Sequence, residues 1–193
     1  MRTKKGFTLT ELIIVLAIIA ILTAILVPAW IGYIRRGRIR TQNDQSRAVF
    51  TSAQTIVQEY RFQERKLDET DRMIGSHAFE MYWDGGKVAS VDIDYTQAEY
   101  SAAPGGTPSG DKAATTPSTS GVQLFGEKLN RLSGADGTIV YKIYIENYIV
   151  KSVVSGRYDT DRFLGSYPKK NDHVVNQSVA ANHISNYDMT SIM

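Results

Sequence analysis

The N-terminal part of the chain consists of a short polar start followed by one long apolar run. Residues 1–6, Met-Arg-Thr-Lys-Lys-Gly, are polar and basic. Residues 12–27 contain no charged side chain and one polar side chain, Thr23, and Glu11 is the single charged residue between positions 7 and 34. A helix of about 20 apolar residues is long enough to cross the hydrocarbon core of a bilayer. The pattern therefore predicts a membrane-spanning helix over residues 7–34.

An amphipathic pattern follows the apolar run. Apolar side chains recur at spacings of three and four at Val49, Ala53, Ile56 and Tyr60. This spacing is typical of one face of an α-helix, and the chain has no proline between Pro28 and Pro104. We expect one nearly continuous helix from about residue 8 to about residue 66, with residues 35–66 as its amphipathic part. At 1.5 Å per residue it would be roughly 90 Å long, too long for a domain of this size to bury along its whole length.

Three residues weaken the middle of this helix. Pro28 removes one helical hydrogen bond, and Gly32 and Gly37 each cost about 1 kcal/mol relative to alanine. We expect a kink or a locally extended segment between residues 27 and 37. A gently kinked helix without functional meaning is the alternative.

The remaining residues, 67–193, are expected to form a globular head. Residues 101–121 are rich in Gly, Pro, Ser, Thr and Ala, which is typical of a flexible loop. A short helix is expected over residues 122–132, with Phe125, Leu129 and Leu132 on one face. The polar tail, residues 171–193, gives no firm prediction.

Alternation of apolar and polar residues predicts the strands of the head. Residues 138–146 alternate strongly and residues 148–155 follow after Asn147, so the two are expected to form an antiparallel hairpin. Shorter strands are expected over residues 87–93 and near residues 162–167. The predicted fold class is α+β, with a long N-terminal helix and a small antiparallel sheet in the head.

Charge is distributed unevenly along the chain, although the net charge is only +2. Residues 35–66 contain eight Lys or Arg and three Asp or Glu, a balance of 8 − 3 = +5. Residues 68–193 contain eleven Lys or Arg and sixteen Asp or Glu, a balance of 11 − 16 = −5. The simplest explanation of this uneven distribution is that the helix and the head each expose charged side chains to solvent. The alternative is attraction between the basic helix of one copy and the acidic head of a neighbouring copy. The basic segment has no aromatic or motif support for nucleic-acid binding, so no specific nucleic-acid site is predicted.

A basic start followed by an apolar run has three interpretations. A secretory signal peptide needs a shorter apolar core and a small-residue cleavage site after it, and neither is present. The second interpretation is a plain membrane anchor, and the third is the precursor of a filament subunit. Both fit the apolar pattern equally well. Glu11 distinguishes the last two, because a carboxylate inside an apolar helix is costly and is by default a functional group with a partner.

A cut after Gly6 would create that partner. The new α-amino group of Phe7 would be a cation one helical turn from Glu11, and in a staggered assembly it could pair with Glu11 of the next copy. A buried ion pair that loses one partner costs about 3–5 kcal/mol. Such pairing would therefore set the axial register of assembly.

The segment Lys5-Gly6-Phe7-Thr8-Leu9-Thr10-Glu11, with the apolar run and Pro28 after it, resembles the signal of type IV pilins and type II secretion pseudopilins. The close resemblance covers residues 1 to about 34, and the rest agrees only in architecture. The resemblance implies that a prepilin peptidase removes residues 1–6 after Gly6 and methylates the amine of Phe7. It also implies that Glu11 pairs with that amine in a neighbouring subunit and that Pro28 marks the helix kink of the family.

The resemblance further implies partners and a location. The partners would be further copies of the chain, the prepilin peptidase, the assembly platform, a motor ATPase and, before assembly, the membrane. The precursor would cross the cytoplasmic membrane once with its N-terminus inside, and the assembled filament would be extracellular. A basic start favours that orientation, but Arg35, Arg36, Arg38 and Arg40 oppose it, so charge alone does not decide.

The resemblance is compatible with several functions. The leading prediction is a structural type IV pilus subunit, the alternative is a pseudopilin of a secretion or DNA-uptake machine, and a membrane-anchored binding domain is a remote third. Many family heads contain a C-terminal disulfide loop, which this chain cannot form because it has no cysteine. Its sheet must be fastened otherwise, by the tail or by a metal.

Other candidate chemistry is weak. Asp159 with Asp161, and Asp92 with Asp94, are spaced as pairs that calcium could use, but two isolated pairs are more often turn or surface carboxylates. The three histidines match no zinc spacing: His77, His173 and His183. No nucleophile elbow, phosphate loop or triad signature is present in the sequence. We therefore predict no enzymatic activity, no metal site and no cofactor.

Overall fold

The structure is a computed structural model that describes residues 7–67, 72–75, 78–94, 114–115, 121–134 and 139–193. The chain divides into two compact units, Met1–Gly37 and Arg38–Met193. Most of the predicted loop over residues 101–121 lies outside the described residues. The fold class is α+β, as the sequence predicts, with a long N-terminal helix and an antiparallel sheet.

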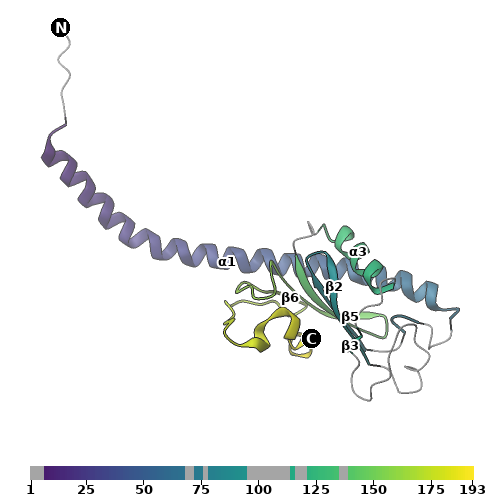
Figure 1. Cartoon of the computed structure of the whole chain (residues 1–193). Helices are drawn as coiled ribbons and strands as arrows, with labels where there is room; N and C mark the ends of the chain where they lie inside the picture. Colours follow the sequence, from purple (N-terminus) through teal and green to yellow (C-terminus); the bar gives the residue numbers. More distant parts are fainter. Residues whose placement is uncertain (1–6, 68–71, 76–77, 95–113, 116–120, 135–138) are drawn as a thin grey trace, which may run out of the picture. The chain divides into compact units, whose positions relative to one another are not determined.

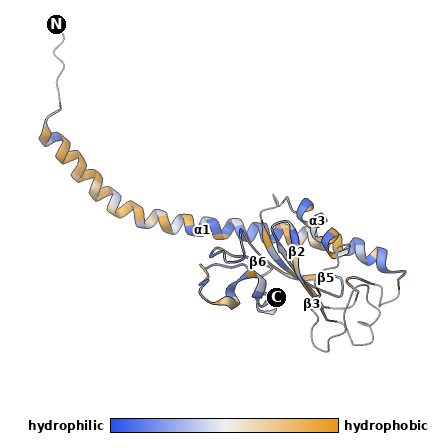
Figure 2. Ribbon diagram, in the orientation of Figure 1, coloured by the Kyte–Doolittle hydropathy of each residue, from blue (hydrophilic) through white to orange (hydrophobic). Residues whose placement is uncertain are grey.

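Helix α1 extends from Leu9 to Glu64 (Figure 1), which confirms the predicted continuous helix. It is helical through Pro28, Gly32 and Gly37, so the locally extended segment is not formed. One missing hydrogen bond and two glycines do not outweigh the strong helix formers around them. Figure 2 shows that the first part of α1 is almost uniformly hydrophobic, whereas its later turns mix hydrophobic and hydrophilic residues. The two parts of the predicted helix therefore differ as the sequence pattern indicates.

The head contains a six-stranded antiparallel sheet with the order β3-β2-β1-β4-β5-β6. Strand β5 pairs with β4 on one side and with β6 on the other, so the predicted hairpin and third strand are confirmed. The sequence prediction missed β1, which pairs with both β2 and β4. The strands are β1 (Ala78–Asp84), β2 (Lys87–Asp94), β3 (Ala114–Thr115), β4 (Val140–Glu146), β5 (Ile149–Gly156) and β6 (Gly165–Tyr167).

One face of the sheet packs against the helices of the head. Helix α3 (Gly121–Leu132) confirms the predicted short helix. It buries Phe125 and Leu129 against the sheet, whereas Leu132, the last residue of the helix, is 54% exposed. The core of this layer joins residues of α1, α3 and the sheet: Val49, Ala53, Ile56, Val57, Phe125, Leu129, Met81, Trp83, Tyr141, Ile143 and Ile145.

The opposite face of the sheet is covered by the C-terminal tail, whose structure the sequence does not predict. The tail contains three short 3₁₀ helices, η2 (Ala180–Asn182), η3 (Ile184–Asn186) and η4 (Met189–Ile192). Their apolar side chains Ile184, Met189 and Ile192 form a second cluster with side chains of the sheet, Tyr82 and Val154 among them. The sheet is therefore the middle layer of three.

Close contacts fasten the end of the sheet to α1. A Cβ on Gly165 would lie 2.0 Å from the carbonyl oxygen of Gln42, so only glycine allows β6 to approach the helix backbone this closely. The buried hydroxyls of Ser46 and Ser155 are hydrogen-bonded at 2.8 Å. Small residues thus bring the helix and the sheet edge together.

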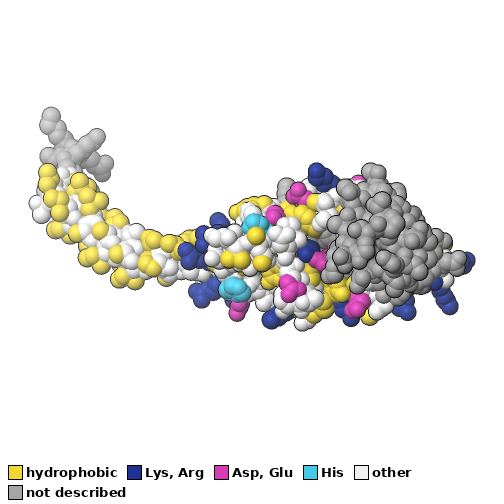
Figure 3. All heavy atoms as spheres, turned by 60° about the horizontal axis from the view of Figure 1, so that its bottom comes forward, with side chains coloured by type: hydrophobic (Ala, Val, Ile, Leu, Met, Phe, Trp, Pro, Cys, Tyr) yellow, Lys and Arg dark blue, Asp and Glu magenta, His cyan; other side chains and the backbone are white. Residues whose placement is uncertain are grey.

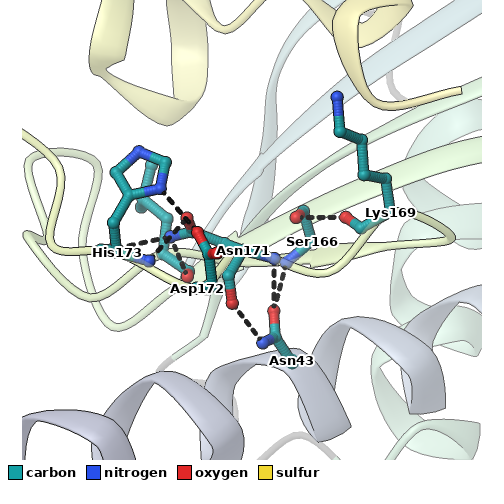
Figure 4. A network of polar contacts seen from close by, with 7 residues as sticks. Asn43, Ser166, Lys169, Asn171, Asp172 and His173 are labelled. Carbon is teal, nitrogen blue, oxygen red and sulfur yellow. Dashed lines mark hydrogen bonds and ion pairs between the residues drawn. The ribbon is translucent and has the colours of Figure 1, made fainter.

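The side-chain amide of Asn43 joins α1 to the segment after β6 (Figure 4). Its Oδ1 accepts hydrogen bonds from the amides of Ser166 at 3.0 Å and Asn171 at 3.2 Å. Its Nδ2 donates to the carbonyl of Asn171 at 2.7 Å. Polar bonds of this kind, together with the packed tail, fasten the C-terminal segment of a head that contains no disulfide.

Candidate functional site at the start of helix α1

Helix α1 begins with a capping box formed by Thr8 and Glu11. The amide and the hydroxyl of Thr8 donate to Oε2 of Glu11 at 2.9 and 2.8 Å. In return, Thr8 Oγ1 accepts from the amide of Glu11 at 3.3 Å, and the carbonyl of Thr8 accepts the first helical bond from Leu12. Reciprocal bonds of this kind satisfy amides that the first turn of a helix otherwise leaves unpaired. Glu11 therefore has a local role within a single chain.

The capping box places the Glu11 carboxylate beside the candidate cleavage position. Gly6 lies outside the described residues, and Phe7, the first described residue, is 84% exposed. The nitrogen of Phe7 is one residue before the Thr8 amide that already donates to Glu11, so a cut before Phe7 would generate an ammonium group close to the carboxylate. Glu11 was identified from the sequence because of its charge. The Thr-x-x-Glu spacing of Thr8 and Glu11 is the sequence signal for the capping box.

The surface of the first α1 turns is apolar on every side. The large hydrophobic side chains between positions 7 and 34 are 40% to 84% exposed, and Figure 3 shows hydrophobic side chains over the visible surface of this segment. Its one polar interior residue, Thr23, bonds within the helix to the carbonyl of Ile19 at 2.6 Å. By length and hydropathy, α1 contains one candidate membrane span. Such a surface needs lipid or other apolar helices around it.

The weak calcium candidates Asp159 and Asp161 bond to the protein itself. The carboxylate of Asp161, which is buried, accepts from the amides of Arg157 and Phe163 at 3.0 and 2.9 Å. The carboxylate of Asp159 accepts from the amide and hydroxyl of Ser185 at 2.7 and 3.1 Å. No group of three or more metal-ligating side chains occurs among the described residues. The pair therefore shapes the loop after β5 and attaches η3 to it.

The remaining polar candidates are not brought together. His173 contacts Asp172, and Nδ1 of His183 lies 3.7 Å from Asp159. His77 and the side chains of Asp92 and Asp94 lie outside what the structure describes. Within the described part, the N-terminal capping box and its apolar helix are the site that the sequence singles out.

Comparison with known proteins identifies this N-terminal segment. Residues 1–27 match the family described as "Prokaryotic N-terminal methylation motif". A fimbrial protein of Pseudomonas aeruginosa is 41% identical over 59 residues, which are 31% of this chain and 38% of that protein. The type IV major fimbrial protein FimA of Dichelobacter nodosus is 43% identical over 54 residues, 28% of this chain and 35% of that protein. By its N-terminal segment the chain is similar to type IV fimbrial proteins, and residues 1–27 contain their methylation motif.

The pilin resemblance is local. A third relative, a fimbrial protein of Moraxella nonliquefaciens, is 56% identical over 39 residues, 20% of this chain and 25% of that protein. The chain thus spans 25% to 38% of the length of these pilin relatives. No solved structure matches the chain. The similarity to pilins therefore does not extend over most of the head, and the six-stranded sheet and packed tail are known from the structure alone.

Proposed function

We propose that this chain is the precursor of a type IV pilus subunit. A prepilin peptidase would cut it after Gly6 and methylate Phe7, and the mature chain would polymerise through the first half of α1. The observation that carries the proposal is Glu11, the one charged residue between positions 7 and 34, in the first turn of a helix whose large apolar side chains in that range are all exposed. The fimbrial relatives favour a pilin over the alternative, a pseudopilin of a secretion or DNA-uptake machine.

The apolar helix provides the means of assembly. Before assembly it would be solvated by lipid as a single membrane span with the N-terminus inside. Transfer from lipid into a helical bundle changes little in hydrophobicity, because lipid tails are as apolar as the side chains, so packing between helices must supply the free energy. Extraction from the membrane is therefore expected to need the assembly platform and a motor ATPase. Residues 7–34 would form the core of the resulting extracellular filament.

Glu11 can keep its helix cap and still bind a second donor. Both Thr8 bonds end on Oε2, and among the described residues Oε1 has no hydrogen-bond partner. The methylated ammonium of a neighbouring Phe7 could therefore bond to Oε1 without dismantling the capping box. In an apolar bundle this charge pair would be strongly preferred to either charge alone. The pair would thus fix how far one subunit is staggered from the next.

Two variants separate the charge of Glu11 from its capping function. Glu11→Gln keeps an oxygen that can accept from Thr8 but removes the charge. Thr8→Val removes the hydroxyl from the cap and keeps the charge. We expect Glu11→Gln to be cleaved normally and to form few or no fibres in negative-stain electron microscopy of the cells. Thr8→Val should be cleaved and should assemble with a modest loss, because one cap bond contributes about 1 kcal/mol.

Two outcomes would count against the proposal. If Glu11→Gln assembles as the parent does, the charge pair does not set the register. If the parent chain itself forms no long surface fibres in cells that cleave it, the pseudopilin alternative replaces the pilus subunit.

A further inference from the structure

A hollow of about 590 Å³ lies at the C-terminal end of α1, inside the head unit, and it contains none of the residues on which the proposed function rests. It is lined by Gln58, Arg61, Phe62, Arg65, Arg72 and Tyr148. Three guanidinium groups and two aromatic rings therefore converge on one cavity. These residues come from α1, from the segment after it and from the turn between β4 and β5.

The wall of the hollow is rigidly built around a buried carboxylate. Glu64 is 4% exposed and accepts from the hydroxyl of Tyr148 at 2.7 Å and from the amides of Met73 and Gly75 at 2.9 and 3.3 Å. Gln58 Nε2 donates to the carbonyl of Tyr148 at 3.1 Å. Tyr148 is thus fixed from both its ring end and its backbone. A ligand would meet a preformed surface rather than a loose loop.

The open side of the hollow contains two guanidinium groups without a polar partner among the described residues, and one exposed aromatic ring. Arg61 and Arg65 are one helical turn apart, an arrangement of like charges that is mildly destabilising without an anion between them. Within the described residues, neither guanidinium takes part in an ion pair or a hydrogen bond. Phe62, between them in sequence, is 78% exposed. Arg72 donates twice to the carbonyl of Leu67, at 3.0 and 2.9 Å, and so holds the rim.

We propose that this hollow binds single-stranded nucleic acid. Arg61 and Arg65 would contact successive phosphates, and the exposed ring of Phe62 would stack on an unpaired base. Basic grooves with aromatic platforms bind single strands in this way, whereas a duplex keeps its base faces covered. The sequence predicts no such site because Arg61, Phe62 and Arg65 match no nucleic-acid-binding motif, and the hollow beside them is completed by Tyr148 from a distant turn. Because salt screens the attraction between guanidinium groups and phosphates, the interaction is best measured at low salt.

The test uses the full-length chain in detergent and fluorescence anisotropy with a labelled oligothymidine of about fifteen nucleotides. The double variant Arg61→Gln/Arg65→Gln should bind more weakly, and the slope of log affinity against log salt should fall by about 1.4, or roughly 0.7 for each phosphate lost. Phe62→Leu should weaken binding about tenfold with an unchanged salt slope, since base stacking supplies the difference. An abasic oligonucleotide of equal length should not distinguish Phe62→Leu from the parent.

Matched controls are exposed residues of the same kinds elsewhere on the head, Arg47→Gln and Tyr158→Leu, which should bind as the parent does. All substituted side chains are exposed, so loss of fold does not explain a change. The proposal is overturned if the parent does not bind the oligonucleotide. It is also overturned if heparin or duplex DNA binds at least as tightly with the same dependence on Arg61 and Arg65, because the hollow would then be a general polyanion site.

Discussion

Replacing Asn43 by alanine should loosen the C-terminal segment of the head. The Asn43 amide forms three hydrogen bonds to backbone groups of Ser166 and Asn171. Alanine would leave two amide donors and one carbonyl without these partners at a position where Asn43 is 5% exposed. The bonds join residues 123 and 128 positions apart in sequence, so they connect α1 directly to the end of the sheet.

The expected loss follows from the number of bonds. A typical intramolecular hydrogen bond contributes about 1 kcal/mol net, and three of them give roughly 3 kcal/mol in the free energy of unfolding. Water can reach part of the site after the side chain is removed, which brings the expected loss to about 2–3 kcal/mol. This is a large share of the stability of an ordinary domain.

Urea unfolding of the full-length chain in detergent measures the loss, because the buried Trp83 reports on the core of the head. Limited trypsin digestion adds a local probe, since Lys169 and Lys170 are exposed between Ser166 and Asn171 and should be cut faster in the variant. Asp44→Ala is the matched control, an exposed neighbour on the same helix. If Asn43→Ala unfolds within about 0.5 kcal/mol of Asp44→Ala, or is cut no faster, the hydrogen-bonded attachment does not hold the segment.

Two further changes test the contact of β6 with α1 and the cap of η4 in the tail. Gly165→Ala should destabilise the head by at least about 1–3 kcal/mol, because its Cβ would lie 2.0 Å from the Gln42 carbonyl oxygen; Gly86→Ala, with nothing within 4 Å, should be nearly neutral in the same urea titration. Asp188 accepts from Thr190, which holds its pKa below the usual value. Its contribution should be complete above about pH 4 and decline as the pH falls through the lowered pKa, and Asp188→Asn should remove that part of the acid sensitivity.

The parts of the fold that the sequence predicts are those with a clear period. The spacing of Val49, Ala53 and Ile56 predicts the buried face of α1, and alternation predicts β4, in which Tyr141, Ile143 and Ile145 are fully buried. Strand β1 escaped detection because both of its faces are covered. Phe79, Met81 and Trp83 face the helices, but Tyr82 on the other side is also buried under the tail, so apolar residues follow one another without clean alternation.

Other features depend on contacts between distant residues and could not be predicted locally. The tail is held by side chain–backbone bonds, such as Ser152 to the carbonyl of Met189 at 3.0 Å, and such bonds leave no periodic signal. The basic hollow requires Tyr148 to meet Glu64 across 84 positions. By contrast, the capping box of Thr8 and Glu11 is entirely local. The sequence alone predicts it through the Thr-x-x-Glu spacing, and only the proposed pairing of Glu11 with the Phe7 amine of a neighbouring copy would depend on assembly.

The most direct test of the central proposal is the mass of the mature N-terminus, measured by top-down mass spectrometry on the chain isolated from membranes or fibres of its own cells. Removal of six residues would leave 193 − 6 = 187 residues. The expected N-terminal residue is Phe7 bearing one additional methyl group on its nitrogen. An intact Met1, or a start at any residue other than Phe7, would contradict the assignment of this chain as a processed filament subunit.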